Sequence, residues 1–314
     1  MKILFLLSRD HEDIGVAEIE ALAGKKAKKS GRLVVMQTRF KDFERLAYTK
    51  RIIRLLFSCK AERLMDKINS YDWSKVYERD YSLRKISSKD GFKEKDLADA
   101  VWKKLKNPKA NLRNAKTRIE VIIENGKAYC GLLLHENKGF DERRAHLRPG
   151  FHPSSLHPKL ARAMVNLTEA KKGRTIFDPF CGTGGLLIEA GLMGLRCVGY
   201  DVDENMIIKA DKNMKHYNIK DYRLELRDST KLARKMSYVV SDLPYGKNTK
   251  TKDIDNIYSG FFNRLRNLLG KRAVIGLPDF VASEKYVEGF KKKHEFSYRI
   301  HKSLSKKILV LERL

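Results

Sequence analysis

One short stretch carries residue types that suit chemistry on a flat, amino-bearing base. Residues 241–246 read Ser-Asp-Leu-Pro-Tyr-Gly at the end of an apolar run. An exocyclic amino nitrogen shares its lone pair with the ring, so it must leave conjugation before it can attack a methyl group. The carboxylate of Asp242 and the carbonyl of Leu243 could each accept one N–H and orient that lone pair. Pro244 restricts Leu243 to an extended backbone, and Tyr245 offers a face for stacking a flipped base.

A glycine turn lies upstream of this motif. Residues 178–185 read Asp-Pro-Phe-Cys-Gly-Thr-Gly-Gly, and the candidate cofactor contacts are Asp178, Phe180, Gly182 and Gly184. Glycines let the backbone approach a ligand closely, and a following helix would point its amino terminus at that ligand. A dinucleotide is the alternative, but the spacing is not G-x-G-x-x-G directly after a strand. An acidic residue at the strand end favours the α-ammonium of S-adenosylmethionine.

Further acidic and hydroxyl residues follow at the ends of the next expected strands. Asp201 stands where a ribose diol is hydrogen-bonded, with Asp203 as a nearby competitor, while Asp228 and Ser229 are placed to meet the adenine. The structural alternative for each aspartate is a helix N-cap or a turn, and for Asp203 we favour it. Cys181 is interpreted as small packing and not as a covalent nucleophile.

The composition indicates a polyanionic partner. Lys and Arg number 66 against 39 Asp and Glu, a formal net charge of +27. Such an excess predicts nucleic-acid binding through counterion release. The alternative explanation of the excess is a charged surface adapted to heat or salt. The cysteines form no C-x-x-C pair, which fits a reducing cytoplasm. His152 and His157 lack partners at metal-ligand spacing, and no apolar run is long enough to cross a membrane, so we expect neither metal nor membrane.

The elements that must position these residues form an alternating α/β pattern. Seven strand-like runs, most of them separated by helical periods, predict a Rossmann-like, doubly wound sheet that ends in an antiparallel hairpin. Ligands of such sheets lie at the carboxyl ends of the strands, where both motifs fall. The expected strands cover residues 175–177, 196–200, 223–227, 238–241, 272–277, 295–301 and 306–312.

The first half predicts an α+β region. Asn125-Gly126 joins two strand-like runs, a strong hairpin signal because both residues accept positive φ. The expected strands cover residues 2–7, 33–36, 51–57, 80–86, 117–124 and 127–134, and the expected helices cover 13–22, 42–49, 61–69 and 93–105.

Both motifs and the first half resemble a known family. Asp242 to Tyr245 is similar to the D/N-P-P-Y motif of methyltransferases that modify exocyclic amines, with Leu243 replacing the first proline, so some rigidity is lost. Asn-Pro-Lys-Ala-Asn-Leu at 107–112 and the hairpin after it resemble the end of a THUMP domain, an RNA-binding module found behind a ferredoxin-like domain. With the His-Leu-Arg-Pro-Gly segment at 146–150, the chain resembles the archaeal tRNA guanine-N2 methyltransferases that modify guanosine 10.

The resemblance implies a domain order and an RNA interface. It places a ferredoxin-like domain at 1–59, a THUMP domain at 60–141, a linker at 142–158 that lines the cofactor's methionine end, and the methyltransferase domain at 159–314. tRNA is the implied partner of a monomer or weak oligomer. The candidate RNA contacts are Arg143, Arg144, Arg148, Lys247, Lys250 and Lys252.

The sequence therefore predicts a methyltransferase that carries a methyl group from S-adenosylmethionine to the N2 of a tRNA guanosine. Guanine N2 at another tRNA position or in ribosomal RNA is the near alternative, and adenine N6 in DNA shares the motif. From another class, the chain could be an RNA-binding protein that lost activity through Leu243. Whether one or two methyl groups are added stays open.

Overall fold

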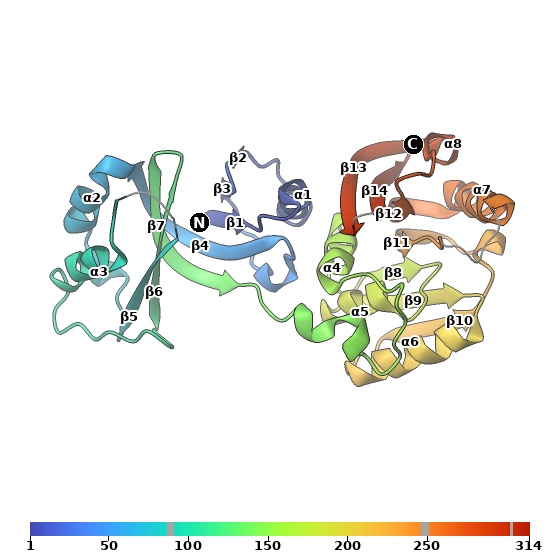
Figure 1. Ribbon diagram of the computed structural model, residues 1–314, viewed down its shortest axis with the longest axis horizontal. Helices are drawn as coiled ribbons and strands as arrows, with labels where there is room; N and C mark the ends of the chain where they lie inside the picture. Colours follow the sequence, from blue (N-terminus) through green and yellow to red (C-terminus); the bar gives the residue numbers. More distant parts are fainter. Residues whose placement is uncertain (87–90, 246–250, 302–303) are drawn as a thin grey trace. The chain divides into compact units, whose positions relative to one another are not determined.

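The computed structural model describes residues 1–86, 91–245, 251–301 and 304–314. The chain divides into two compact units, each containing one seven-stranded sheet (Figure 1). Among the described residues, no helix combines the length and the apolar character needed to span a bilayer. Unit 1 comprises residues 1–9, 26–44 and 49–137, and unit 2 comprises 10–25, 45–48 and 138–314.

The sheet of unit 1 has the order β2-β3-β1-β4-β7-β6-β5. Strand β4, Thr49–Lys60, is twelve residues long and pairs with β1 on one side and β7 on the other. One continuous sheet therefore joins the strands expected for residues 1–59 to those expected for 60–141. The other strands are β1 Lys2–Leu7, β2 Lys29–Ser30, β3 Leu33–Gln37, β5 Tyr81–Ile86, β6 Thr117–Glu124 and β7 Lys127–Glu136, with helices α2 Leu64–Ser70 and α3 Glu94–Trp102.

The predicted β-hairpin at Asn125-Gly126 is confirmed. Both residues have positive φ, 51° and 71°, and the strands on either side, β6 and β7, pair antiparallel from Glu124 and Lys127 outward. The two largely apolar strands therefore turn where the sequence offers residues that accept the left-handed region.

The helix predicted over residues 42–49 is wrong. Only a short 3-10 turn, Phe43–Arg45, forms there. The backbone amides of Ala47 and Tyr48 donate instead to the buried carboxylate of Glu18, at 3.1 and 2.8 Å. Because a side chain already satisfies these amides, the segment has no need of helical hydrogen bonds.

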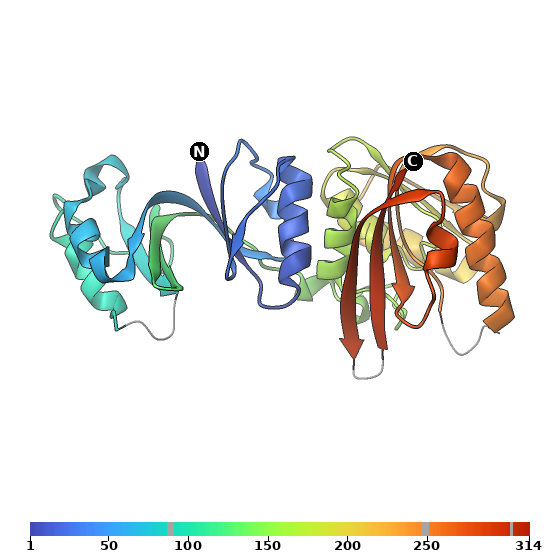
Figure 2. The ribbon, with the colours of Figure 1, turned by 90° about the horizontal axis from the view of Figure 1, so that it is seen from above.

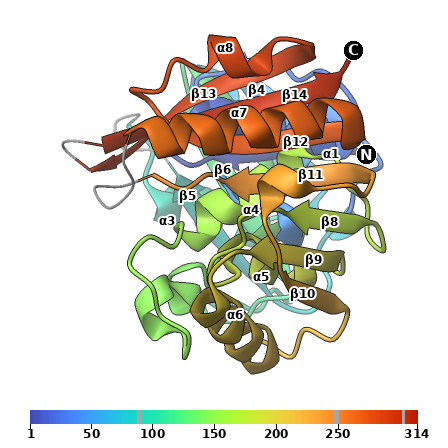
Figure 3. The ribbon, with the colours of Figure 1, turned by 90° about the vertical axis from the view of Figure 1, so that its right-hand side faces the viewer.

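The sheet of unit 2 has the order β10-β9-β8-β11-β12-β14-β13, with an antiparallel final hairpin (Figure 3, where β10 to β12 follow one another upward). The doubly wound prediction is confirmed. The strands are β8 Thr175–Asp178, β9 Arg196–Asp201, β10 Tyr222–Leu226, β11 Met236–Asp242, β12 Leu269–Pro278, β13 Phe290–His301 and β14 Leu304–Arg313; the helices are α1 Glu12–Ala23, α4 Pro158–Leu167, α5 Gly185–Leu192, α6 Glu204–His216, α7 Thr251–Leu268 and α8 Glu284–Val287.

Two apolar cores cover the two faces of this sheet. Along β11, Tyr238 and Val240 belong to the core that includes α4 and α5, whereas Val239 belongs to the core that includes α7. This alternation follows from the two-residue period of a strand, and it explains why the run 238–240 is apolar throughout. A sheet buried on both faces holds the end of β11 rigidly, and that end carries Asp242.

Helix α1 lies alongside α4 within unit 2 (Figure 2). The side-chain amide of Asn166 in α4 donates to Glu18 in α1 at 2.8 Å and to the backbone carbonyl of Arg45 at 2.8 Å. Burial raises the pKa of Glu18 to about 7. These contacts fix α4, whose Met164 packs near the end of β11.

Candidate active site

Asp178 ends β8 as a buried carboxylate with two protein donors. Its side chain is 1% exposed, and its Oδ1 accepts from the Ser241 hydroxyl at 2.6 Å and from the backbone N–H of Phe180 at 3.2 Å. Burial raises the pKa of Asp178 to about 7, and the nearby carboxylates of Asp201 and Asp242 add to the rise. The Ser241 bond links the glycine turn directly to the strand that carries the second motif.

The glycine turn adopts the backbone that only glycine takes easily. Gly182 and Gly184 have φ of 50° and 80°, and Gly184 stands at the N-cap of α5. The amino end of α5 therefore follows the turn, as the sequence predicts. Cys181 is buried among apolar neighbours, and burial raises its pKa well above the ordinary value, so packing describes it better than nucleophilic reactivity.

Asp201 binds the turn to the end of β9. Its Oδ2 accepts from the Gly182 N–H at 2.8 Å and its Oδ1 from the Asp203 N–H at 3.0 Å. Asp203 caps α6 by accepting from the Asn205 N–H at 2.8 Å, the structural role that the sequence favoured. Each oxygen retains a lone pair beyond its protein bond, so Asp201 can still accept a hydrogen bond from a ribose. Ribose binding by Asp201 stays a prediction.

Asp228 and Ser229 make local contacts at the end of β10. Asp228 accepts from the backbone and hydroxyl of Thr230, at 2.9 and 2.7 Å, and these bonds lower its pKa. Its side chain remains 38% exposed. The hydroxyl of Ser229 is buried and donates to the carbonyl of Pro179, so it braces the glycine turn. Contact of either residue with adenine stays a prediction.

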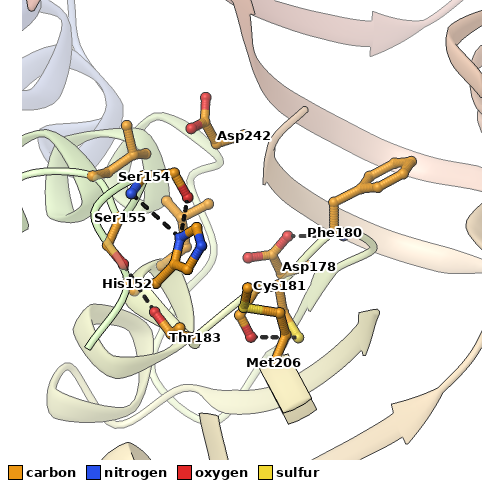
Figure 4. Close-up of a pocket in the computed structure, with 13 residues that line it drawn as sticks. His152, Ser154, Ser155, Asp178, Phe180, Cys181, Thr183, Met206 and Asp242 are labelled. Atoms are coloured by element: carbon orange, nitrogen blue, oxygen red, sulfur yellow. Dashed lines mark hydrogen bonds between the residues drawn. The ribbon is translucent and has the colours of Figure 1, made fainter. Parts of the chain in front are cut away.

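One pocket brings the two motifs together (Figure 4). Its empty space is about 450 Å³, part of which is open to solvent. The predicted site residues Asp178, Phe180, Gly182 and Asp242 all line it. The other lining residues are His152, Ser154, Ser155, Leu156, Cys181, Thr183, Gly185, Leu186 and Met206.

The segment before α4 closes one side of this pocket, as the resemblance implied. The hydroxyls of Ser155 and Thr183 lie 2.9 Å apart and join that segment to the glycine turn. Ser154 lies beside the His152 ring, whose Nδ1 is 2.7 Å from the Ser154 hydroxyl. The described residues contain no His, Cys, Asp and Glu group able to hold a metal ion.

The backbone after Asp242 is fixed at two points. Leu243 is fully buried in the core beside α7, and its N–H donates to the carbonyl of Gly276 at 3.0 Å. The carbonyl of Pro244 accepts from the hydroxyl of Tyr258 at 2.7 Å. A proline at Leu243 could not donate this hydrogen bond. The rigidity that the first proline would supply therefore has a replacement here.

Asp242 forms an ion pair that the sequence did not reveal. Both carboxylate oxygens contact the Nζ of Lys306, which comes from β14 and is 0% exposed. The same Nζ lies 4.0 Å from the centroid of the Tyr245 ring. Burial raises the pKa of Asp242, and Lys306 opposes that rise. Sixty-four positions separate Lys306 from Asp242, so no local pattern could have found the pair.

The predicted RNA contacts differ in their surroundings. Arg143 binds the buried Glu189 through Nε at 2.7 Å, and Arg148 is 3% exposed. Arg144 is 49% exposed and pairs with Asp141. Of these three arginines, Arg144 is the one with its guanidinium open to solvent. The other three predicted contacts, Lys247, Lys250 and the side chain of Lys252, lie outside the described part of the chain.

The chain is similar to known methyltransferases over its whole length. The RMKL-like, methyltransferase domain family matches residues 145–308, and a DNA methylase family matches residues 22–212. A tRNA (guanine(10)-N2)-dimethyltransferase of Methanothermobacter thermautotrophicus is 32% identical over 100% of both chains. The Pyrococcus abyssi protein of that name is 34% identical over 86% of this chain and 85% of its own. TrmN from Thermus thermophilus has the same fold, with a TM-score of 0.55 at 18% identity over 100% of both chains.

Proposed function

The chain belongs to the family of tRNA (guanine(10)-N2)-dimethyltransferases, and from that membership we propose that it methylates the N2 of guanosine 10 in tRNA. S-adenosylmethionine is the methyl donor. The observation that carries the proposal is the single pocket that Asp178 and Asp242 line together. It gives a cofactor motif and an amine-orienting motif one shared space at the carboxyl ends of neighbouring strands.

The donor set of the pocket fits the cofactor. A buried carboxylate whose pKa is raised to about 7 gains most from a cationic partner, and the α-ammonium of the methionine end is such a partner. Asp178 therefore binds that ammonium, and Phe180, Gly182 and Gly184 shape the turn around it. The ribose and adenine of the cofactor contact residues at the ends of β9 and β10, namely Asp201, Asp228 and Ser229.

Asp242 and Leu243 act on the amine. The bound donor supplies an electrophilic methyl group. The carboxylate of Asp242 and the carbonyl of Leu243 each accept one N–H, which turns the nitrogen lone pair away from the ring and stabilises the positive charge that grows on it. The new N–C bond would replace the sulfur–methyl bond of the donor, whose electron pair would stay on sulfur, and the nitrogen would then release its extra proton to water. The bonds of Leu243 to Gly276 and of Pro244 to Tyr258 hold this acceptor pair in place before the base arrives.

tRNA is the partner we propose. The net charge of +27 supplies the attraction, and the THUMP-like strands of unit 1 supply a second surface for the same molecule. The domain bounds that the resemblance implies, 1–59, 60–141, 142–158 and 159–314, are part of this proposal. Four free cysteines suit the reducing cytoplasm in which tRNA is modified.

The reaction is tested by a single-group change in the substrate. Unmodified tRNA should accept methyl groups from labelled S-adenosylmethionine, whereas the same tRNA with inosine at position 10, which lacks only the 2-amino group, should accept none. Mass analysis of the nucleosides then distinguishes one methyl group from two. Label in the inosine tRNA would move the site to another guanosine, and label in DNA or ribosomal RNA at a comparable rate would replace tRNA as the substrate.

The motif is tested by removing its carboxylate. Asp242→Ala should lose methyl transfer while it still binds S-adenosylhomocysteine. Asp221→Asn is the matched control, because Asp221 is exposed and precedes β10, an edge strand of the same sheet, whereas Asp242 ends the central strand β11. Equal activity of wild type and Asp242→Ala would remove the proposed mechanism.

A further inference from the structure

Lys306 reaches Asp242 from inside the protein and not from the pocket. Its side chain is 0% exposed and is not part of the pocket lining, whereas Asp242 is 15% exposed and lines the pocket. The ammonium and the incoming base therefore approach the carboxylate from different directions. A carboxylate offers about four lone-pair positions, so contact with Lys306 leaves acceptor capacity toward the pocket.

The sheet register brings this pair together across one glycine. Asp242 in β11 faces Gly276 in β12, and Lys306 in β14 is paired with Pro278, two residues farther along β12. A Cβ on Gly276 would lie 2.6 Å from Oδ1 of Asp242, a distance that side chains do not tolerate. Only glycine at this position leaves the carboxylate room to meet Lys306.

The same ammonium also holds the aromatic residue of the motif. Lys306 Nζ lies 4.0 Å from the Tyr245 ring centroid, well within the range of a cation–π contact. One buried cation thus contacts both side chains that the proposed reaction assigns to the base, the orienting carboxylate and the stacking ring.

We propose that Lys306 is a positioning residue for methyl transfer, which keeps Asp242 ionised, directs its carboxylate to the amine and fixes the ring of Tyr245. The proposal rests on the proposed function. Lys306 needs no contact with the base to do this. Without it, this nearly buried carboxylate would lose the cation that the described residues place beside it and would take up a proton more readily. A protonated Asp242 is a poorer acceptor for the amine N–H.

The charged and titratable groups around Asp242 give the direction of the pH effect. Lys306 from β14 lowers the pKa of Asp242, while burial raises it and is the larger cause. Asp178 at the end of β8 and the hydroxyl of Tyr258 lie close enough to the same carboxylate for its charge to raise their pKa values, and neither of them is a cation. Loss of Lys306 should therefore raise the pKa of Asp242 further. The acid limb, which is the low-pH side of the plot of kcat against pH, should then move to higher pH.

The test compares Lys306→Met with Lys307→Met and Lys306→Arg. Lys307 is the matched control because it neighbours Lys306 on β14 but donates to the Val281 carbonyl. We expect Lys306→Met to lower kcat by at least about tenfold and to shift the acid limb upward, with the cofactor KM unchanged. Lys306→Arg should restore part of kcat and the wild-type acid limb, and Lys307→Met should match the wild type. An unchanged acid limb in Lys306→Met overturns the proposal, as does an equal loss in Lys307→Met.

A second measurement separates this proposal from the proposed function. The carboxyl carbon of Asp242 can be followed by NMR in protein with labelled aspartate, its signal identified by its absence from Asp242→Asn. Its titration midpoint should lie at higher pH in Lys306→Met than in the wild type. If that shift occurs but the wild type methylates no tRNA, the function fails and the support of Asp242 by Lys306 stands. If tRNA is methylated but the midpoint does not move, the role of Lys306 fails.

Gly276→Ala carries the test if Lys306→Met does not fold. Its added methyl group must displace the Asp242 carboxylate while the lysine charge remains. We expect a loss of kcat of at least about tenfold together with a shift of the acid limb to higher pH, because the displaced carboxylate loses its contact with Lys306. Wild-type kcat in a folded Gly276→Ala protein would contradict the positioning role.

Discussion

The buried carboxylate of Asp178 should make the ligand-free protein less stable as the pH rises. In the folded protein burial raises its pKa from 3.8 to about 7. Both protein donors, Ser241 and the Phe180 amide, contact the same oxygen, Oδ1. Asp178→Asn should therefore keep both hydrogen bonds through its amide oxygen while it removes the ionisable group.

The sign and size of the effect follow from proton linkage. Between about pH 4 and about pH 7 the folded state holds a proton on Asp178 that the unfolded chain has already lost, so stability falls across this window and levels off above it. At about 1.4 kcal/mol per pKa unit, a rise from 3.8 to about 7 corresponds to roughly 4 kcal/mol as an upper limit. Asp178→Asn should lack this loss and exceed the wild type by about 2–4 kcal/mol at pH 8.

Urea unfolding from pH 4 to pH 8, with and without ligand, measures this. S-adenosylhomocysteine carries the α-ammonium, so its affinity for the wild type should increase as Asp178 ionises between pH 6 and pH 8. Methylthioadenosine lacks the amino-acid end and serves as the matched ligand, with an affinity that should not change. In Asp178→Asn the affinity for S-adenosylhomocysteine should be weaker and independent of pH.

Two results would refute the reasoning. Parallel stability curves for wild type and Asp178→Asn would mean that Asp178 is not protonated in the folded protein near neutral pH. An equal pH dependence for both ligands would mean that the carboxylate does not meet the amino-acid end of the cofactor, and Asp178 would then be a structural residue alone.

Three further predictions concern the motif and the RNA surface. Leu243→Pro introduces the first proline of the D/N-P-P-Y motif but loses the N–H bond to Gly276 and a fully buried side chain. It should therefore lower the free energy of unfolding by at least about 2 kcal/mol and reduce kcat, and wild-type values would contradict this. Arg144→Met should raise the KM for tRNA and leave the free energy of unfolding unchanged within about 0.5 kcal/mol. Arg143→Met removes a partner of the buried Glu189 and should lower the free energy of unfolding in urea by about 2 kcal/mol or more. The reverse pattern would exchange their roles. Filter binding should give a tRNA affinity that falls steeply and linearly on a log–log plot against salt, with a shallower slope in Arg144→Met, and a salt-independent affinity would remove the electrostatic argument.

Local patterns predicted the parts of the fold and site that local residues determine. The doubly wound sheet of unit 2 with its antiparallel final hairpin was predicted from apolar runs separated by helical periods, because a strand buried on both faces is largely apolar. Asp178 and Asp242 fell in one pocket because both end adjacent parallel strands. The helix expected over 42–49 failed because Glu18, far along the chain, takes the amides that the helix would have used. A long-range acceptor of this kind leaves no trace in a local window.

The contact of Lys306 with Asp242 could not be predicted from local sequence patterns. Along β14, Ile308 and Val310 pack in the core that includes α4, while Leu309 and Leu311 pack in the core that includes α7. The two-residue period assigns Lys306 to the first of these faces, where an apolar side chain would be expected. Two adjacent lysines at a strand end look like solvated charges, and only the register of β12 against β11 and β14 shows that one of them meets a carboxylate. A one-residue slip of β14 would turn Lys307 toward Asp242's face and Lys306 away from it, so the ion pair and the apolar alternation depend on the same register.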